Sequence, residues 1–404
     1  SMEEEAVGEG SGSGGPQEVE VEVEEKEERK NGSDVRQLVA FVNSRSGSRQ
    51  GLQLIRKLER CTLLQERGVE LQIFDLADFS TNGCFQWLRD HAGTHGLRLL
   101  VCGGDGTVSW VTSEISRAMP PVSPPLAVIP LGTGNDFSRS LYAGSGFTGG
   151  NIRPYVDLAI SSPARDYDVW RVLIAKGDTP EGQDDWAFLD EEIELTRSTF
   201  DRGSSDPVEC FIMMNYFGIG LLSGISHRFH HFRENHACCT STRCCNKLWY
   251  GCFGCGQCCR GRMLTSIVDD FIVDGRKSPI EMDFREITFI NIPSFAAGTN
   301  LWKMRKRDAQ GGKKFQPQAL DDGLLEVVGI SSINHMMNIR TGASKAHKLV
   351  QASSYRLKIS TDRPYHIQID GEAREFTSCR IAIDLLRRQP VVQFPEDALK
   401  SCCC

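Results

Sequence analysis

The chain has 404 residues, of which 40% are hydrophobic and 25% are charged, and its formal net charge at pH 7 is -7. Residues 1–33 hold 11 Glu against three basic residues, which leaves the rest of the chain close to neutral. A near-neutral body excludes a dedicated nucleic-acid binder, and no apolar run of about 18 residues is present to span a membrane. At about 150 residues per domain, the length predicts two or three domains.

The first half of the chain predicts an α/β domain. Residues 1–34 are acidic and rich in Gly and Ser, so we expect a disordered tail. Over 35–163, a strand, a Gly-bearing loop and a helix recur three times, and the short apolar runs are typical of buried strands. This order predicts a Rossmann-like, doubly wound parallel sheet with its loops at the carboxyl ends of the strands. The expected strands are residues 38–43, 69–74, 97–102 and 126–130.

The second half has a different pattern. Over 164–396, short β-branched segments are separated by turn residues such as Asp-Asp-Gly and Asp-Gly-Glu. Several short strands with few helices predict a β-rich, sandwich-like second domain, from which the last strands are free to return to the first. Residues 397–404 form a Cys-rich tail.

Three loops of the first domain share one composition. Gly-Gly-Asp-Gly-Thr at 103–107 follows a strand and opens a helix, which is a ready anion site. Asp105 there suits either Mg²⁺ binding and hydroxyl positioning or a plain helix cap. Loops 43–47 and 131–136 carry the same small polar residues, so the three together predict one nucleotide-phosphate site. Neither a Walker A motif nor the protein-kinase motifs are present, which indicates another phosphoryl-transfer class.

These motifs resemble the diacylglycerol kinase family over roughly residues 36–395. Val101-Cys-Gly-Gly-Asp-Gly-Thr-Val108 and Val128-Ile-Pro-Leu-Gly-Thr-Gly-Asn-Asp136 resemble its catalytic domain. The Gly-Gly-Asp-Gly-Thr loop alone also fits sphingosine, ceramide or NAD kinases. The downstream segments favour diacylglycerol and are similar to family signatures at 168–170, 214–220, 291–302, 321–326 and 368–372.

The resemblance implies a lipid kinase with a catalytic and an accessory domain. Such an enzyme uses ATP and Mg²⁺ to convert 1,2-diacylglycerol to phosphatidic acid, and we expect it in the cytoplasm, peripheral at membranes. Domain 35–163 would bind ATP and domain 164–396 would bind the lipid. Patterns of C1 modules and EF-hands are absent, which predicts a short form. The family pattern has an Asp where this chain has Leu222, so a non-catalytic lipid or nucleotide sensor stays open as an alternative.

The resemblance also implies roles for single residues. Asp105 would lie at the reacting centre, and Glu372 would be the general base on the lipid hydroxyl, oriented by Asp370. Asp322, with Asp321, would hold a structural Mg²⁺. The expected ATP-binding residues are Asn43, Ser44, Ser46, Gly47, Gly103, Gly104, Gly106, Thr107, Leu131, Gly132, Thr133, Gly134, Asn135 and Asp136.

The 16 cysteines require separate interpretations. Eight lie between 238 and 259, where Cys252, Cys255 and Cys258 have the two-residue spacing of zinc ligands. A zinc site, an acylated surface loop and unmodified reduced thiols all stay open there. The terminal cysteines 402–404 are either acyl acceptors that would help anchor the protein to a membrane or an unmodified tail.

Overall fold

The computed structural model describes most of the chain. It describes residues 35–78, 83–118, 122–177, 186–187, 189–190, 193, 208–236, 263–304 and 315–399. The expected acidic tail, the cysteine cluster at 238–259 and the terminal cysteines lie outside these residues. Within the described ranges, no helix combines the length and the apolar character that crossing a bilayer requires.

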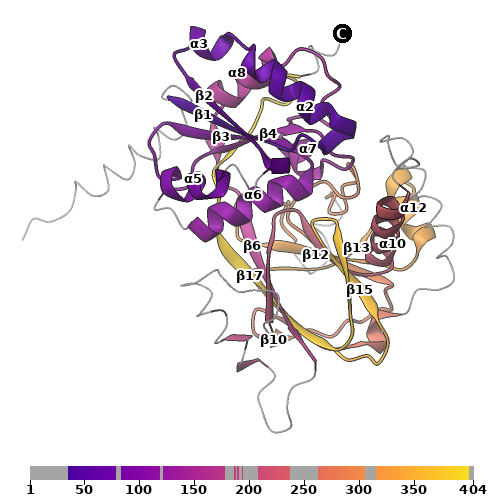
Figure 1. Cartoon of the computed structure of the whole chain (residues 1–404). Helices are drawn as coiled ribbons and strands as arrows, with labels where there is room; N and C mark the ends of the chain where they lie inside the picture. Colours follow the sequence, from indigo (N-terminus) through magenta and orange to yellow (C-terminus); the bar gives the residue numbers. More distant parts are fainter. Residues whose placement is uncertain are drawn as a thin grey trace, which may run out of the picture.

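The first lobe is built on a mostly parallel sheet, drawn in indigo and purple in Figure 1. Strands β1 to β4 and β18 run parallel, and β5 is antiparallel to β18. The strand order is β2 (Glu70–Asp75), β1 (Gln37–Val42), β3 (Leu97–Gly103), β4 (Leu126–Pro130), β18 (Val391–Val392) and β5 (Ala164–Arg165). The helices are α2 (Ser46–Glu59), α3 (Leu63–Glu66), the short η2 (Leu76–Asp78), α5 (Cys84–His91), α6 (Asp105–Ala118), α7 (Asp136–Ser140) and α8 (Arg153–Ser161).

Helices cover both faces of this sheet. Along β1, Leu38 belongs to the core cluster that contains side chains of α2 and α8, whereas Val39 belongs to the cluster that contains side chains of α5 and α6. Successive residues of a strand point to opposite faces, so a strand that is apolar throughout must be buried on both sides. The predicted doubly wound architecture is confirmed.

The second lobe contains two antiparallel sheets of six strands each. One has the order β10 (Arg276–Lys277), β9 (Val268–Val273), β14 (Ser354–Ile359), β17 (Cys379–Arg388), β6 (Asp168–Lys176) and β7 (Val208–Met213). The other has the order β13 (His347–Ala352), β12 (Leu325–Ile330), β11 (Glu286–Ile290), β8 (Tyr216–Gly220), β15 (Tyr365–Ile369) and β16 (Glu372–Phe376). The remaining elements are α10 (Leu221–Asn235), η4 (Leu264–Ser266) and α12 (Ile333–Thr341).

The core of the second lobe lies between these sheets. Trp170 and Ile383 from one sheet share a single buried cluster with Phe217, Phe289 and Ile367 from the other. Alternating strands that bury one face in this way make a sandwich. The β-sandwich-like second domain is therefore confirmed.

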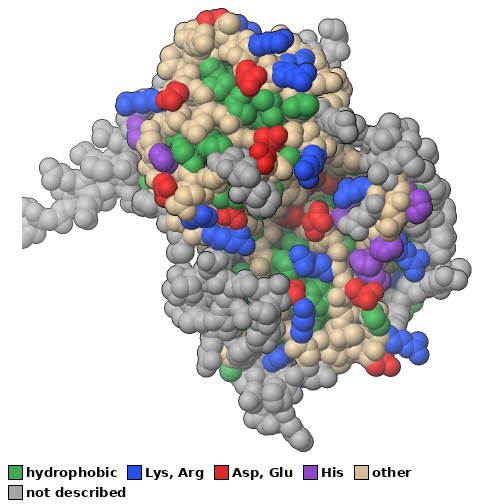
Figure 2. Space-filling model, in the orientation of Figure 1, with side chains coloured by type: hydrophobic (Ala, Val, Ile, Leu, Met, Phe, Trp, Pro, Cys, Tyr) green, Lys and Arg blue, Asp and Glu red, His purple; other side chains and the backbone are tan. Residues whose placement is uncertain are grey.

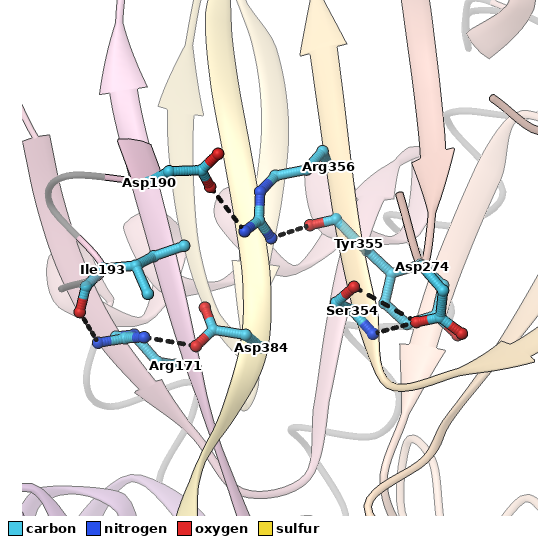
Figure 3. Close-up of polar contacts among 8 residues, drawn as sticks. All are labelled: Arg171, Asp190, Ile193, Asp274, Ser354, Tyr355, Arg356 and Asp384. Carbon is cyan, nitrogen blue, oxygen red and sulfur yellow. Dashed lines mark hydrogen bonds and ion pairs between the residues drawn. The ribbon is translucent and has the colours of Figure 1, made fainter. Parts of the chain in front are cut away.

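The outer face of the first of these sheets is also covered. Figure 3 shows Arg171 on β6, which is 1% exposed, paired with Asp384 on β17 and donating to the Ile193 carbonyl at 3.0 Å. Arg356 on β14 pairs with Asp190 at 3.1 Å. These contacts, together with the packing of Leu189 and Ile193, hold residues 189, 190 and 193 on the sheet. The buried Arg171 guanidinium is thus paired with a carboxylate, as a buried charge requires.

The end of the chain joins the two lobes. β17 leaves the sandwich, and β18 then pairs in parallel with β4, Val391 lying opposite Leu126. The first sheet is thus completed by residues more than 250 positions downstream, and Figure 1 shows the yellow C-terminal segment running up into the indigo lobe.

Candidate active site

The three Gly-bearing loops meet at one edge of the parallel sheet. They follow β1, β3 and β4, which are neighbours in the sheet. Gly104 and Gly132 are in direct contact, because a Cβ on Gly132 would lie 2.6 Å from Gly104 Cα. Gly47 has φ +61°, and a Cβ on it would lie 2.8 Å from the Leu131 carbonyl oxygen. Only glycine permits these approaches, so the structure brings the predicted phosphate loops together.

Side chains fasten the loops to one another. Asn43 Nδ2 donates to Thr107 Oγ1 at 3.4 Å, and the Ser44 N–H donates to Asp75 Oδ1 at 3.2 Å. Gly103 packs against the Thr107 side chain, and Ser46 opens α2. Hydrogen bonds therefore fix the loop after β1 to the start of α6 and to the end of β2.

The loop after β4 has its own fastening. Asn135, at φ 51°, donates from Nδ2 to the carbonyls of Gly132 (2.8 Å) and Ser145 (2.9 Å). Its buried Oδ1 has no hydrogen-bond partner in the described part of the chain. Thr133 is half-buried beside it, and Gly134 faces Asp105 and Asp136 closely, because their Oδ2 atoms would lie 3.2 and 3.4 Å from a Cβ there.

Asp105 connects two of the loops. Its Oδ2 accepts the Asp136 N–H at 3.1 Å and its Oδ1 accepts the Phe137 N–H at 3.0 Å, so the carboxylate caps α7. Burial, and next the nearby charge of Asp136, raise the pKa of Asp105 to about 7. Asp105 is therefore a helix cap, but for α7 and not for α6, the helix that it opens, and it lies among the predicted phosphate loops.

Asp136 connects the first lobe to the second. It is 1% exposed, and its carboxylate accepts the Ser294 hydroxyl and the N–H groups of Ala297 (3.0 and 3.1 Å) and Gly298 (3.1 Å). Ala296, Ala297 and Gly298 all have positive φ, which turns successive N–H groups toward one anion. The segment 291–302 therefore binds the carboxylate of Asp136 and so fixes the end of the loop after β4.

Asp370 and Gly371 form a two-residue hairpin turn between β15 and β16. Ile369 pairs with Glu372 across it, and both central residues have positive φ, 50° and 88°. Asp-Gly is the sequence that a type I′ turn prefers. The Asp370 carboxylate is 6% exposed, and burial raises its pKa.

Four hydrogen bonds hold the Asp370 carboxylate. Oδ1 accepts the N–H groups of Asn215 (2.7 Å) and Tyr216 (3.1 Å), and Oδ2 accepts the Met214 N–H (2.9 Å) and the Ser109 hydroxyl (2.5 Å). A carboxylate with this many donors is a fixed anchor. These bonds fix the hairpin turn and therefore the position at which β16 begins with Glu372.

Glu372 begins β16 and reaches the predicted phosphate loop at Gly106. Its side chain is 64% exposed, and its Oε1 lies 3.3 Å from the position that a Cβ on Gly106 would occupy. Glu372 is therefore beside the first turn of α6, next to Asp105. The structure thus brings together Asp105, the Gly-bearing loops and Glu372, which come from distant parts of the sequence.

Asp321 and Asp322 lie in a different acidic group. Asp168 Oδ2 accepts the Gly323 N–H at 2.5 Å, and its Oδ1 accepts Arg388 Nε at 3.1 Å. Burial, and after it the charge of Asp321, raise the pKa of Asp322. The charged groups that act on Asp322 are Asp321 and Arg388, whereas those that act on Asp105 are Asp136 and Asp370. Within the described ranges, no group of three or more His, Cys, Asp or Glu side chains has metal-binding geometry. Cys252, Cys255 and Cys258 fall outside them.

Leu222, where the family pattern has an Asp, occupies the start of α10. Its N–H donates to Glu286 Oε2 at 2.8 Å, and Ser223 Oγ donates to Glu286 Oε1 at 3.1 Å. Glu286 therefore supplies the helix cap from β11, and burial raises its pKa to about 8. The Leu222 side chain packs against a cluster that includes Tyr216 and Phe295.

Several residues that build this site had no role predicted from the sequence. Ser294, Ala297 and Gly298 were within a recognised motif, so the motif was the available signal. Ser109 and Glu286 had none, because a serine in a helix and a glutamate in a strand are ordinary at the level of sequence. Figure 2 shows histidine side chains gathered over α10, beside acidic groups where the lobes adjoin, and these too had no predicted role.

Known proteins resemble this chain over both lobes. Residues 37–172 match the family model of the diacylglycerol kinase catalytic domain, and residues 212–373 match that of the diacylglycerol kinase accessory domain. "Probable diacylglycerol kinase 3" of Caenorhabditis elegans is 32% identical over 87% of this chain and 43% of its own length. Human "Diacylglycerol kinase zeta" is 29% identical over 89% of this chain and 36% of its own length. The chain thus spans less than half of the length of each of these relatives.

The fold also matches a solved structure. A putative diacylglycerol kinase from Bacillus anthracis aligns with a TM-score of 0.54 at 18% identity, covering 90% of this chain and 99% of that one. At this identity the match shows a shared fold.

Proposed function

The chain belongs to the diacylglycerol kinase family, and we propose that it transfers the γ-phosphoryl group of ATP to the free hydroxyl of 1,2-diacylglycerol, giving phosphatidic acid. The observation that carries this proposal is the meeting of the Gly-bearing loops with Asp105 and Glu372 at one place. We assign ATP binding to the domain at 35–163 and lipid binding to the domain at 164–396.

The loops are suited to hold phosphates. The start of α6 and loop 131–136 lie at strand ends, and the dipole of a 14-residue helix adds positive potential there. Because phosphoryl transfer needs positioning and charge stabilisation more than covalent help, such a cradle supplies much of what the reaction requires.

Glu372 is the group best placed to accept the proton of the lipid hydroxyl. It is exposed and adjoins the nucleotide loop, while both oxygens of Asp370 are occupied by donors. As the hydroxyl oxygen bonds to the γ-phosphorus, its proton passes to the Glu372 carboxylate and the bond to ADP breaks. Asp370 holds the turn and accepts no proton in this scheme.

Mg²⁺ is the metal that the family implies, and the acidic group around Asp322 fits a cation. After burial, the charge of Asp321 raises the pKa of Asp322, so the two carboxylates repel each other, and a cation between them would relieve that repulsion. Carboxylate oxygens are the ligands that Mg²⁺ prefers. Asp322 and Asp321 would hold the ion as a structural Mg²⁺, which would neutralise their charge when bound.

The substrate decides where such an enzyme works. Diacylglycerol resides in a bilayer, so we propose that the protein acts in the cytoplasm, at a membrane surface to which it binds peripherally. Acylation of cysteines 402–404, and zinc at Cys252, Cys255 and Cys258, stay predictions.

The test is transfer of ³²P from ATP to diacylglycerol in mixed micelles, with Asp105→Ala and Glu372→Gln beside the wild type. Phosphatidic acid from the wild type, reduced at least about 100-fold in both variants, is expected. Sphingosine, ceramide and NAD are run as parallel acceptors, and phosphorylation of one of these instead would replace the substrate. If no acceptor is phosphorylated, the result would favour the alternative that the protein is a non-catalytic lipid or nucleotide sensor.

A further inference from the structure

One face of α10 supports the Asp370–Glu372 turn from outside. Ser226 and His230 lie one helical turn apart, so they share that face. Ser226, 4% exposed, donates from Oγ to the Gly371 carbonyl at 3.0 Å. His230 Nδ1 lies 3.5 Å from Glu372 Oε2. Two successive turns of the helix thus contact two successive residues of the hairpin.

The His230 contact is on the opposite oxygen from the nucleotide loop. Glu372 Oε2 faces His230, and Oε1 faces Gly106. The Glu372 side chain is 64% exposed and would by itself sample several rotamers, whereas the His230 side chain is 19% exposed and fixed by the helix. The imidazole is therefore a firm neighbour for a carboxylate that is otherwise free to swing into solvent.

We propose that His230 is a positioning residue that holds the Glu372 carboxylate toward Gly106, with Ser226 fixing the turn beneath it. This inference rests on the proposed role of Glu372 as the general base. A base must lie within hydrogen-bond reach of the proton it removes, and a misplacement of about 1 Å costs up to about 100-fold in rate. The two oxygens then have separate tasks: Oε2 is held by the imidazole, and Oε1 is presented to the lipid hydroxyl.

The kinetic test compares His230→Ala and His230→Asn with His231→Ala. Asn places an amide nitrogen near the position of the imidazole Nδ1, so it keeps the donor. His231 is exposed on the neighbouring position of the same helix and contacts Asn235, which makes it the matched control. We expect His230→Ala to lower kcat about 10- to 100-fold with the KM for ATP unchanged, and His230→Asn to recover most of the loss. A purely structural role would not be rescued in this way.

A double-mutant cycle shows whether His230 acts through Glu372. If it does, adding His230→Ala to Glu372→Gln lowers kcat no further than Glu372→Gln alone. If the losses of kcat in the two single variants multiply in the double variant, or if His230→Ala keeps the wild-type kcat, the inference is overturned and the kinase assignment stays intact. Full activity in Glu372→Gln would instead overturn the assignment of the base.

A measurement without turnover separates the two proposals. In full-length protein labelled with [¹³Cε1]histidine, the ring signal of His230 is identified by its loss in His230→Asn. That signal shifts in Glu372→Gln if the contact exists. The same hairpin offers a control, since His366 Nε2 lies 3.5 Å from Glu375 Oε2, so Glu375→Gln should move the His366 signal and leave that of His230. An unmoved His230 signal in Glu372→Gln overturns the inference whether or not the wild type is active.

Discussion

Ser109 and Asp370 are 261 positions apart in the sequence, yet Ser109 Oγ donates a 2.5 Å hydrogen bond to Asp370 Oδ2. Ser109 lies one turn beyond Asp105 on α6, and Asp370 precedes Glu372 by two residues. The bond therefore fixes the nucleotide loop relative to the turn that carries the proposed base. Correct spacing of these two parts is what the transfer of a phosphoryl group demands.

Asp370→Asn should unfold more easily than the wild type. The amide offers one acceptor oxygen where the carboxylate offers two, and its NH₂ group must face a backbone N–H of Met214, Asn215 or Tyr216. We expect a loss of about 1–3 kcal/mol in the free energy of unfolding, measured with urea. Ser109→Ala, which removes one neutral donor, should cost about 1 kcal/mol. Equal losses in the two variants would contradict the anchoring role of the carboxylate.

Gly106→Ala should separate activity from stability. Gly106 is in the first turn of α6, where Ala is favoured by up to about 1 kcal/mol. Its methyl group would nevertheless lie 3.3 Å from Glu372 Oε1 and displace that flexible side chain. We expect thermal stability to be equal or higher and kcat to fall about tenfold. In a Glu372→Gln background the same substitution should have no further effect on kcat, and a further fall would place its cause elsewhere.

Gly132→Ala should weaken ATP binding. The added methyl group would lie 2.6 Å from Gly104 Cα and 2.8 Å from Asn135 Oδ1, so the loops after β3 and β4 must move apart. A strain of about 1–3 kcal/mol corresponds to an increase of about 5- to 150-fold in the Kd for ATP, measured by calorimetry. Gly150→Ala is the control, because no atom lies within 4 Å of its added carbon. An unchanged Kd in Gly132→Ala would show that the loops separate without cost.

Glu286 should make stability depend on pH. Burial raises its pKa from 4.5 to about 8, so the native state retains a proton that the unfolded chain releases. This contribution is present below pH 4.5 and is lost as the pH rises toward 8, with a slope of at most about 1.4 kcal/mol per pH unit. Glu286→Gln keeps a neutral acceptor for the Leu222 N–H and should flatten this part of the curve in urea titrations from pH 5 to 8. An identical slope in the variant would assign the pH dependence to other groups.

Local chemistry explains what the sequence predicted well. Apart from Asn43 and Arg98, every residue of the strands at 38–43, 97–102 and 126–130 is apolar, a pattern typical of strands buried on both faces. Gly-Gly-Asp-Gly-Thr can likewise be recognised without knowing what it contacts. The fold class followed from the order of such segments. Glu372 was assigned through the family motif, because a glutamate at the start of an exposed hairpin strand gives no signal of its own.

By itself the sequence determined the two architectures and predicted the phosphate loops, since periodicity and turn chemistry depend on neighbours along the chain. The tertiary structure alone decided that β18 completes the first sheet, that Asp136 is held by Ser294 and Gly298, and that Glu372 reaches Gly106. Those contacts join residues far apart in sequence. Their side chains meet only because the packing of two lobes fixes where each loop and turn must lie, and no local pattern encodes that distance.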